Sequence, residues 1–234
     1  MTLRPCVILD RDGTLIDLVR DEETGTVGVA FHPSHLVLLP GVVSGLRALL
    51  AHGYQLGIAT NQPGPAKGQF SKQAVERTNQ ALLALLAAEG ISISALAACL
   101  HHPTGAVHGD SSLIGDCNCR KPKPGLLEQL DVQMSIERSK SWMIGDSRAD
   151  MEAARAFGVR AALVFSTERC ELCPLRGGPA GSPESRGSAL RRARRTLAGG
   201  LIQEPSEPAN DPGVPPSHAA SPSGHARLLA KTMN

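Results

Sequence analysis

The stretch ILDRDGT, residues 8–14, lies almost at the start of the chain and decides the fold. The apolar residues that end at Leu9 are typical of a buried strand, and Gly13 marks a sharp exit into a loop. Two acids, Asp10 and Asp12, lie between them. Two carboxylates at the tip of a buried strand are costly unless a positive group lies between them. The stretch therefore predicts a strand whose carboxyl end carries a charged site.

Beyond this stretch, strand and helix patterns alternate as far as about residue 165. Apolar runs predict strands over residues 5–9, 55–60, 95–100, 141–144 and 159–165. Apolar residues at helical spacing predict helices over residues 40–52, 71–89, 124–132 and 148–157, with Ser71 as an N-cap and Gly158 as a C-cap. This alternation predicts an α/β fold, in which helices cover both faces of a mostly parallel sheet in three Rossmann-like layers.

Polar stretches follow four of the predicted strands. They read DRDGT at residues 10–14, TNQPG at 60–64, LHHP at 100–103 and GDSRAD at 145–150. In open parallel sheets, ligands bind beyond the carboxyl ends of the strands. We therefore expect these four stretches to meet along one edge of the sheet.

A second constellation consists of two pairs with a spacing of two residues, Cys99 with His101 and Cys117 with Cys119. Side chains at i and i+2 of an extended chain point the same way, so each pair can present two ligands to one point. Three sulfurs and one imidazole suit a closed, tetrahedral zinc site of structural type. The alternatives are unrelated buried cysteines or two disulfides, and His102 is the alternative imidazole.

Composition sets the remaining bounds. The chain has 234 residues, of which 41% are hydrophobic and 3% aromatic, and its formal net charge is +2. A strand that begins near residue 6 leaves no room for a signal peptide, and no apolar run reaches membrane-spanning length. These features predict a cytoplasmic protein, in which cysteines serve as thiols or metal ligands rather than as disulfides.

Composition also divides the chain into two parts. Residues 1–166 are expected to form the folded domain, whereas residues 167–234 are rich in Pro, Gly and Ser and predict a largely disordered tail. The basic segment ALRRARRTLAGGLI, residues 189–202, is interpreted as a solvated segment, with contact to nucleic acid or an acidic partner as the alternative. Cys170 and Cys173 are interpreted as free thiols, with half a metal site or a redox pair as the alternatives.

Four motifs in a fixed order make residues 5–165 similar to the haloacid dehalogenase (HAD) superfamily. They are DxDGT at 10–14, Thr-Asn at 60–61, Lys-Pro at 121–122 and GDxxxD at 145–150. The resemblance implies the HAD fold and a Mg²⁺-dependent phosphatase that works through an aspartyl-phosphate. Hydrolysis of a phosphate monoester is among the slowest uncatalysed reactions, and a cation that cancels the repulsion between carboxylate and phosphate suits this chemistry.

The resemblance also implies a role for each motif residue. Asp10 would be the nucleophile, and Asp12 the acid that protonates the leaving oxygen and the base that then activates water. Thr60 and the backbone amide of Asn61 would bind the phosphoryl oxygens, and Lys121 would neutralise the same group. The implied Mg²⁺ ligands are the carboxylate of Asp10, the backbone carbonyl of Asp12 and Asp146. Asp150 has two open roles, orienting Asp146 or capping the helix that follows.

The zinc loop joined to CRKPKPG (residues 119–125) and the turn TNQPGPAKGQFS (residues 60–71) narrow the resemblance. They are similar to the D-glycero-D-manno-heptose 1,7-bisphosphate 7-phosphatase and histidinol-phosphatase subfamily. Its members have no large cap domain, and short loops, one clamped by zinc, shape the pocket. Arg120 would grip the distal part of the substrate, such as a second phosphate. The chain departs from the subfamily at Ser147, where a Lys is frequent, and over residues 21–31, which would border the pocket.

Three hypotheses about function follow. The first is a phosphatase for a small phosphorylated sugar, with the heptose bisphosphate as the expected substrate and histidinol phosphate or another sugar phosphate as the alternative. The second, of a different class, is an inactive binding module that zinc stabilises. The third is a transferase that passes the phosphoryl group to another acceptor. No basic groove for nucleic acid is evident, so we expect no nucleic-acid partner. We also expect a monomer that acts on a small phosphorylated sugar and has no membrane partner.

Overall fold

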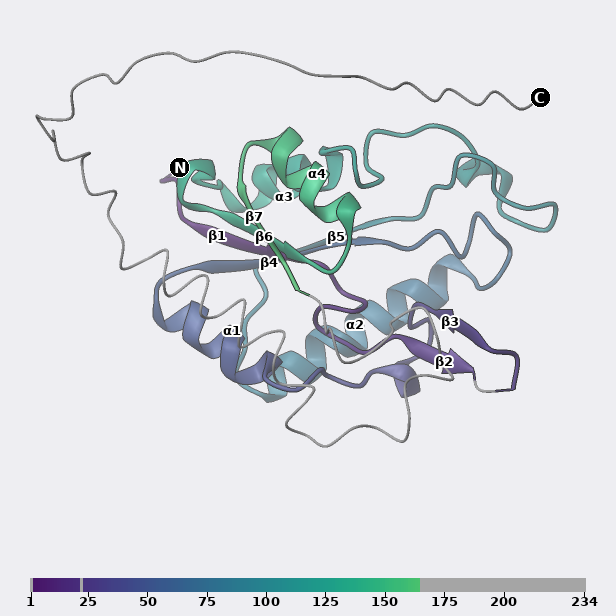
Figure 1. The fold of residues 1–234 in the computed structure, drawn as a ribbon, viewed down its shortest axis with the longest axis horizontal. Helices are drawn as coiled ribbons and strands as arrows, with labels where there is room; N and C mark the ends of the chain where they lie inside the picture. Colours follow the sequence, from purple (N-terminus) through teal and green to yellow (C-terminus); the bar gives the residue numbers. More distant parts are fainter. Residues whose placement is uncertain (1, 22, 165–234) are drawn as a thin grey trace, which may run out of the picture. The chain divides into compact units, whose positions relative to one another are not determined.

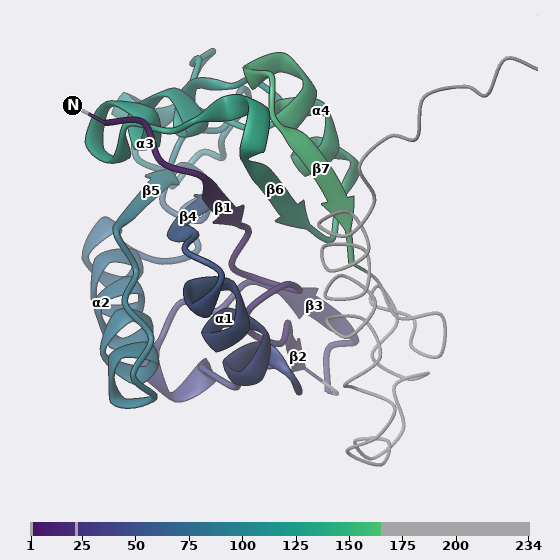
Figure 2. The same cartoon turned by 90° about the vertical axis from the view of Figure 1, so that its left-hand side faces the viewer.

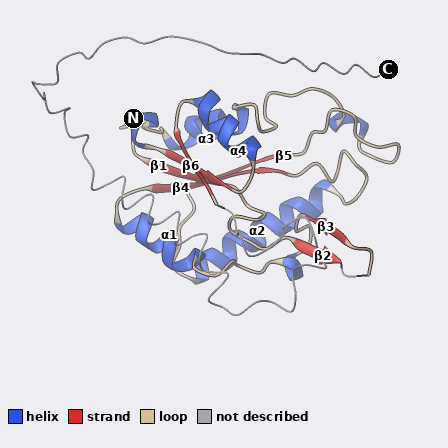
Figure 3. Ribbon diagram, in the orientation of Figure 1, coloured by secondary structure: helices blue, strands red, loops and turns tan. Residues whose placement is uncertain are grey.

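A computed structural model of the chain describes residues 2–21 and 23–164. Strands and helices alternate along the sequence as predicted (Figures 1 and 3). The strands are β1 (Cys6–Leu9), β2 (Val19–Asp21), β3 (Thr26–Gly28), β4 (Gln55–Asn61), β5 (Ala95–Cys99), β6 (Trp142–Gly145) and β7 (Arg160–Leu163). The helices are α1 (Val42–Ala51), α2 (Lys72–Ala88), α3 (Gly125–Met134) and α4 (Arg148–Phe157), and 3-10 turns cover Pro33–His35, Ser111–Leu113 and Arg138–Lys140.

Five strands form one parallel sheet in the order β5–β4–β1–β6–β7. β1 lies at the centre, where Val7 is in register with Leu56 of β4 and with Trp142 of β6. Helices α1 and α2 cover one face of this sheet, and α3 and α4 cover the other (Figure 2). The structure therefore confirms the predicted three-layer α/β fold.

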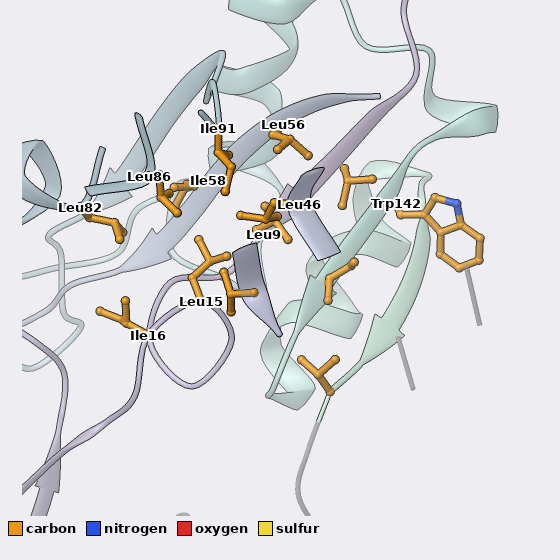
Figure 4. Close-up of a cluster of buried hydrophobic side chains, with 14 of the residues drawn as sticks. Leu9, Leu15, Ile16, Leu46, Leu56, Ile58, Leu82, Leu86, Ile91 and Trp142 are labelled. Carbon is orange, nitrogen blue, oxygen red and sulfur yellow. The ribbon is translucent and has the colours of Figure 1, made fainter. Parts of the chain in front are cut away.

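Alternating residues of the central strand feed two separate cores. Leu9 of β1 packs on one face with Leu46 of α1 and Leu82 of α2, as the close-up in Figure 4 shows. Ile8 points to the opposite face, where it joins Leu126 and other residues of the second core. Because both faces of β1 are buried, the strand is apolar without interruption, which is typical of a parallel sheet.

The helix ends agree with the predicted capping residues. The Ser71 side chain accepts a hydrogen bond from the Ala74 amide at 3.1 Å and begins α2. Gly158 ends α4 with φ of 88°, in the left-handed region that glycine adopts without steric cost. Helix α3 runs to Met134, two residues beyond the predicted end at Val132.

A small antiparallel hairpin occupies the segment for which the sequence offers no firm expectation. Strands β2 and β3 pair with Val19 opposite Gly28, between β1 and α1. The described residues between β1 and α1 add only this hairpin and a 3-10 turn, so no large cap domain is inserted there. This agrees with the expected absence of a cap.

Several predictions concern residues outside the described part of the chain. The tail over residues 167–234, the basic segment 189–202 and the pair Cys170 and Cys173 all lie there. Among the described residues, none of the helices combines the length and the apolar character needed to cross a membrane.

Candidate active site

The carboxyl ends of β1, β4 and β6 bring the predicted catalytic residues to one edge of the sheet. Asp10 follows β1 directly, and its amide donates to the carbonyl of Ile144 in β6 at 2.9 Å. Thr60 lies at the end of β4, and Asp146 follows β6. The sheet order therefore makes neighbours of residues that are up to 136 positions apart in the sequence.

Lys121 is the buried cation of this edge, with 4% of its surface exposed. Its Nζ donates to Asp10 Oδ1 at 2.7 Å, to Asp150 Oδ1 at 2.6 Å and to the carbonyl of Ala59 at 2.8 Å. Burial opposes the charge, but the two carboxylates outweigh it and raise the pKa of Lys121. The ammonium is thus held charged beside the predicted nucleophile.

Three carboxylates converge at the same point. Asp10, Asp146 and Asp150 each offer an oxygen, and these atoms lie within 4.8 Å of one another. Burial, opposed in part by Lys121, raises the pKa of Asp10 to about 6. Burial together with the charges of Asp10 and Asp150 raises the pKa of Asp146 to about 7. The single charge of Lys121 does not balance the negative charge of three carboxylates. The carboxylates offer only oxygen atoms as ligands, and such a donor set fits a hard cation such as Mg²⁺.

Gly13 allows the cluster to form. Its φ of 80° lies in the left-handed region, and a Cβ at this position would overlap Oδ2 of Asp146. Any side chain here would both strain the turn and displace the Asp146 carboxylate. The glycine of DxDGT is therefore a requirement of the site as well as of the turn.

Asp150 fills one of the roles left open by its sequence position, the cap of α4, and it also binds Lys121. Its Oδ2 accepts hydrogen bonds from the amide of Ser147 at 3.1 Å and from its hydroxyl at 2.5 Å, which caps α4. Its Oδ1 binds Lys121. Asp150 thus begins the helix that follows Asp146 and also orients the lysine.

The carboxylate of Asp12 lies in a cage of four hydrogen-bond donors. Arg11 donates through Nε to Oδ2 at 2.9 Å and through Nη2 to Oδ1 at 3.2 Å. The Ala30 amide donates to Oδ1 at 2.8 Å, and Gln62 Nε2 donates to Oδ2 at 2.7 Å. Each Asp12 oxygen accepts two of these bonds, so the carboxyl group is fixed in one orientation. Asp12 is thereby anchored by residues that do not belong to the cluster of three acids.

Thr60 and Asn61 lie where β4 ends. Thr60 is buried, and its hydroxyl accepts from Gln62 Nε2 at 2.9 Å. The Asn61 side chain binds the backbone of Lys121 twice, donating to its carbonyl at 3.0 Å and accepting from its amide at 3.1 Å. The Asn61 side chain therefore fixes the loop that carries Lys121.

The four residues of the second constellation also meet. Cys99 Sγ lies 3.0 Å from Cys119 Sγ and 3.7 Å from Cys117 Sγ, and His101 Nδ1 lies 3.8 Å and 3.3 Å from the sulfurs of Cys99 and Cys119. Tetrahedral zinc with Zn–S bonds of about 2.3 Å places neighbouring ligand atoms roughly 3.5–3.8 Å apart. His102 instead accepts from the amides of the turn that follows it. The donor set and its spacing fit zinc.

Burial acts on the protonation of two of these thiols. Burial raises the pKa of Cys99 and of Cys119, so these thiols do not ionise readily on their own. Zinc binds the thiolate form and displaces the proton. All four cysteines among the described residues are free of disulfides.

Backbone hydrogen bonds join the Cys/His loop to the turn after β4. The Ala106 amide donates to the carbonyl of Ala66 at 3.1 Å, and the Asp110 amide donates to that of Pro65 at 3.0 Å. Arg120, next to Cys119, donates to the carbonyl of His101 at 3.2 Å. A change in the Cys/His loop is therefore passed to the turn that follows Thr60 and Asn61.

Some residues of the site were not identified from the sequence. Gln62 lies in the polar stretch at residues 60–64, but no role was predicted for its side chain. Ala30 contributes a backbone amide that any residue could supply. Asn79 lies in the middle of α2, far from the motifs in the sequence. Asn79 Oδ1 accepts from Arg11 Nη1 at 2.6 Å. A polar residue on the buried face of α2 was the one available signal for Asn79.

Comparisons with known proteins agree with this geometry. Residues 118–171 match the HAD-hydrolase-like family model. A D-glycero-beta-D-manno-heptose-1,7-bisphosphate 7-phosphatase of Rhodopseudomonas palustris is 35% identical over 156 residues, which are 67% of this chain and 81% of that protein. The protein of the same name from Escherichia coli K12 is 31% identical over 164 residues, which are 70% of this chain and 80% of that protein.

Solved structures share the fold. A HAD-like phosphatase from Mesorhizobium loti has a TM-score of 0.60 and 28% identity over 83% of this chain and 88% of its own. The D,D-heptose 1,7-bisphosphate phosphatase of B. bronchiseptica, complexed with magnesium and phosphate, has a TM-score of 0.59 and 24% identity over 84% of this chain and 99% of its own. The second comparison supports the fold alone.

A parallel sheet with an acid-rich carboxyl edge and a buried lysine defines a hydrolase of the HAD type. Within this superfamily, the chain belongs to the family of D-glycero-beta-D-manno-heptose-1,7-bisphosphate 7-phosphatases. It is accordingly a phosphatase.

Proposed function

We propose that the chain is a Mg²⁺-dependent phosphomonoesterase that removes the 7-phosphate of D-glycero-D-manno-heptose 1,7-bisphosphate. The observation that carries the proposal is the convergence of Asp10 with Lys121 and Asp146 at the edge of the sheet. A buried carboxylate with an ammonium 2.7 Å away can approach a dianionic phosphate, because the repulsion between the anions is reduced. The names of the relatives support the choice of substrate.

The residues of this chain divide the reaction into two displacements. An Asp10 oxygen attacks phosphorus, the bond to the sugar oxygen breaks, and Asp12 gives that oxygen a proton. A water then attacks phosphorus, passes its proton to Asp12, and releases phosphate from Asp10. Lys121, the Thr60 hydroxyl and the Asn61 amide stabilise the charge on the phosphoryl oxygens in both steps.

The residues that would hold Mg²⁺ are Asp10, Asp146 and the backbone carbonyl of Asp12. When bound, the ion supplies Lewis-acid neutralisation of the phosphoryl charge. Both oxygens of Asp150 already accept hydrogen bonds, one from Lys121 and one from Ser147 at the cap of α4. We therefore assign Asp150 to holding Lys121 in place rather than to binding Mg²⁺. Removal of Mg²⁺ by dialysis into magnesium-free buffer, which leaves a four-ligand zinc ion in place, is expected to abolish phosphate release, and renewed addition of Mg²⁺ restores it.

Cys99, His101, Cys117 and Cys119 would hold zinc in a structural role. We predict that Cys117→Ser loses zinc and loosens the loop, which raises KM by about tenfold while kcat falls by less. The physical reason is the pair of backbone hydrogen bonds that joins this loop to the turn after β4. Zinc content per chain and steady-state kinetics measure the two effects.

Cys6→Ala is the matched control for this variant. Cys6 is a buried thiol of β1 that lies outside the Cys/His cluster, so its removal should leave the zinc content and KM unchanged. If Cys117→Ser keeps the zinc content and kinetics of the unmodified chain, the four-ligand assignment is wrong.

The substrate is tested by a phosphate-release screen with Mg²⁺. It compares both anomers of the heptose bisphosphate with histidinol phosphate and fructose 1,6-bisphosphate. We expect one heptose anomer to exceed the other compounds in kcat/KM by at least about tenfold, since Arg120 suits a second phosphate. A larger kcat/KM for histidinol phosphate would reassign the substrate. Phosphate release without any added acceptor excludes the transferase, and a folded chain that releases none would be the binding module.

A further inference from the structure

Arg11 is completely buried, and each of its three side-chain nitrogens donates at least one hydrogen bond. Besides its two bonds to Asp12, it donates through Nη1 to Asn79 Oδ1 at 2.6 Å and through Nη2 to the carbonyl of Ala30 at 2.5 Å. A buried guanidinium is tolerated only where its charge is paired and its N–H groups are bonded. The side chain is therefore fixed on one side by Asp12 and on the other by Asn79 and Ala30.

Asn79 and Thr78 are the two polar residues on the buried face of α2, and the Thr78 hydroxyl donates to the Ala74 carbonyl of its own helix. Val75, Leu82 and Leu86 of the same helix are buried in the core, and Asn79 itself is only 7% exposed. A leucine at this position would continue the helical pattern. The carboxamide oxygen of Asn79 instead accepts a hydrogen bond from Arg11, which lies 68 positions away in the sequence.

The remaining donors to Asp12 come from the two segments that border the site. Ala30 follows the β2–β3 hairpin, and Gln62 follows β4. Gln62 is buried, and its Oε1 lacks a hydrogen-bond partner among the described residues, so its one bonded group is the amide that faces Asp12 and Thr60. The Arg11 guanidinium is the member of the cage that contacts both oxygens of Asp12.

We propose that Asn79 and Arg11 are positioning residues for the acid–base step, in which Asn79 fixes Arg11 and Arg11 fixes the Asp12 carboxylate. The proposal rests on the proposed function, in which Asp12 protonates the leaving oxygen. Misplacement of a proton donor by a fraction of its hydrogen-bond length lowers the rate of proton transfer. Asn79 touches neither the phosphate-binding residues nor the three acids in any hydrogen bond of the described residues, so its removal isolates this effect.

The test uses two aryl phosphates that differ in their need for an acid. The phenolate of phenyl phosphate is a poor leaving group and requires a proton, whereas 4-nitrophenolate leaves without one. For Asn79→Leu we expect kcat/KM for phenyl phosphate to fall by about tenfold. The value for 4-nitrophenyl phosphate should stay within about threefold of the unmodified enzyme, because it reports attack at phosphorus with little need of an acid.

Two further variants make the result decisive. Asn79→Ala, which removes the acceptor without adding bulk, is assayed in the same way and should show the same selective loss, which covers the case in which Leu is not accommodated. Gln80→Ala, at the next and exposed position of α2, should leave both substrates unchanged. Equal losses for the two substrates, or none, in both Asn79 variants would overturn the proposal.

The variant Asp12→Asn distinguishes the positioning role of Asn79 from the acid–base role of Asp12 on which it rests. If Asp12→Asn retains the phenyl phosphate activity of the unmodified enzyme, the acid–base role of Asp12 is wrong. If Asp12→Asn loses that activity but the Asn79 variants show no selective loss, Asp12 keeps its role and the positioning by Asn79 is wrong.

Discussion

Replacing Asp10 with Asn is expected to abolish phosphate release, with a fall in kcat of at least about 10⁴-fold. The carboxamide keeps the size of the side chain and can still accept from Lys121, but it cannot form the bond to phosphorus. The thermal unfolding midpoint and the zinc content should remain close to those of the unmodified chain. Release of phosphate from the heptose bisphosphate, measured with excess Mg²⁺, is the direct assay.

Asp116→Asn is the matched control for the nucleophile. Its carboxylate is almost fully exposed and makes a 3.9 Å ion pair with Lys123, so the same chemical change there should alter kcat by less than about twofold. Normal turnover by Asp10→Asn would refute the assignment of the nucleophile, whatever the substrate.

The second large effect is expected for Lys121→Met. Both of its carboxylate partners are buried, so removal of the ammonium leaves Asp10 and Asp150 facing one another. Breaking a buried ion pair in this way costs about 3–5 kcal/mol of folding free energy. The rate should also fall, by about 10²–10³-fold, because the charge on the phosphoryl group is no longer balanced.

The pH dependence of this variant provides a second measurement. Burial and Asp150 raise the pKa of Asp10, while Lys121 lowers it, so loss of the lysine raises it further above its value in the unfolded chain. A carboxyl with a raised folded pKa begins to cost stability above its unfolded pKa, and the cost keeps growing until the pH exceeds the folded pKa. In urea unfolding without Mg²⁺, the loss of unfolding free energy of Lys121→Met relative to the unmodified chain should therefore be larger at pH 8 than at pH 5. Lys123→Met, an exposed neighbour, should show no deficit at either pH.

The local pattern of the sequence was sufficient for the layers of the fold. Each helix and strand of the sheet lies within two residues of its predicted bounds over the described residues, because burial of apolar faces follows the 2-residue and 3.6-residue periods directly. The β2–β3 hairpin was not predicted. Its three-residue strands are only partly buried, so they carry too few apolar positions to set a period.

The catalytic and metal-binding side chains of the site could be predicted from the sequence, whereas most of their hydrogen-bond partners became visible only in the structure. The edge rule for parallel sheets brought Asp10 and Asp146 together, and the i, i+2 spacing brought Cys117 beside Cys119. The cage around Asp12 could not be predicted in this way. Apart from the adjacent Arg11, its members Ala30 and Gln62 are 18 and 50 positions away, and Ala30 acts through a backbone amide that carries no signature in the sequence.

The two ends of the β2–β3 hairpin differ in how they are held. Ala30, after the hairpin, is bonded to Asp12, whereas Thr24 and Thr26 near its tip make exposed hydrogen bonds with close neighbours in the sequence. The tip can therefore be lengthened, shortened or exchanged while the base of the hairpin stays in place. Over evolutionary time, such exchanges would let one catalytic frame acquire new phosphorylated metabolites without rebuilding the machinery that cleaves them.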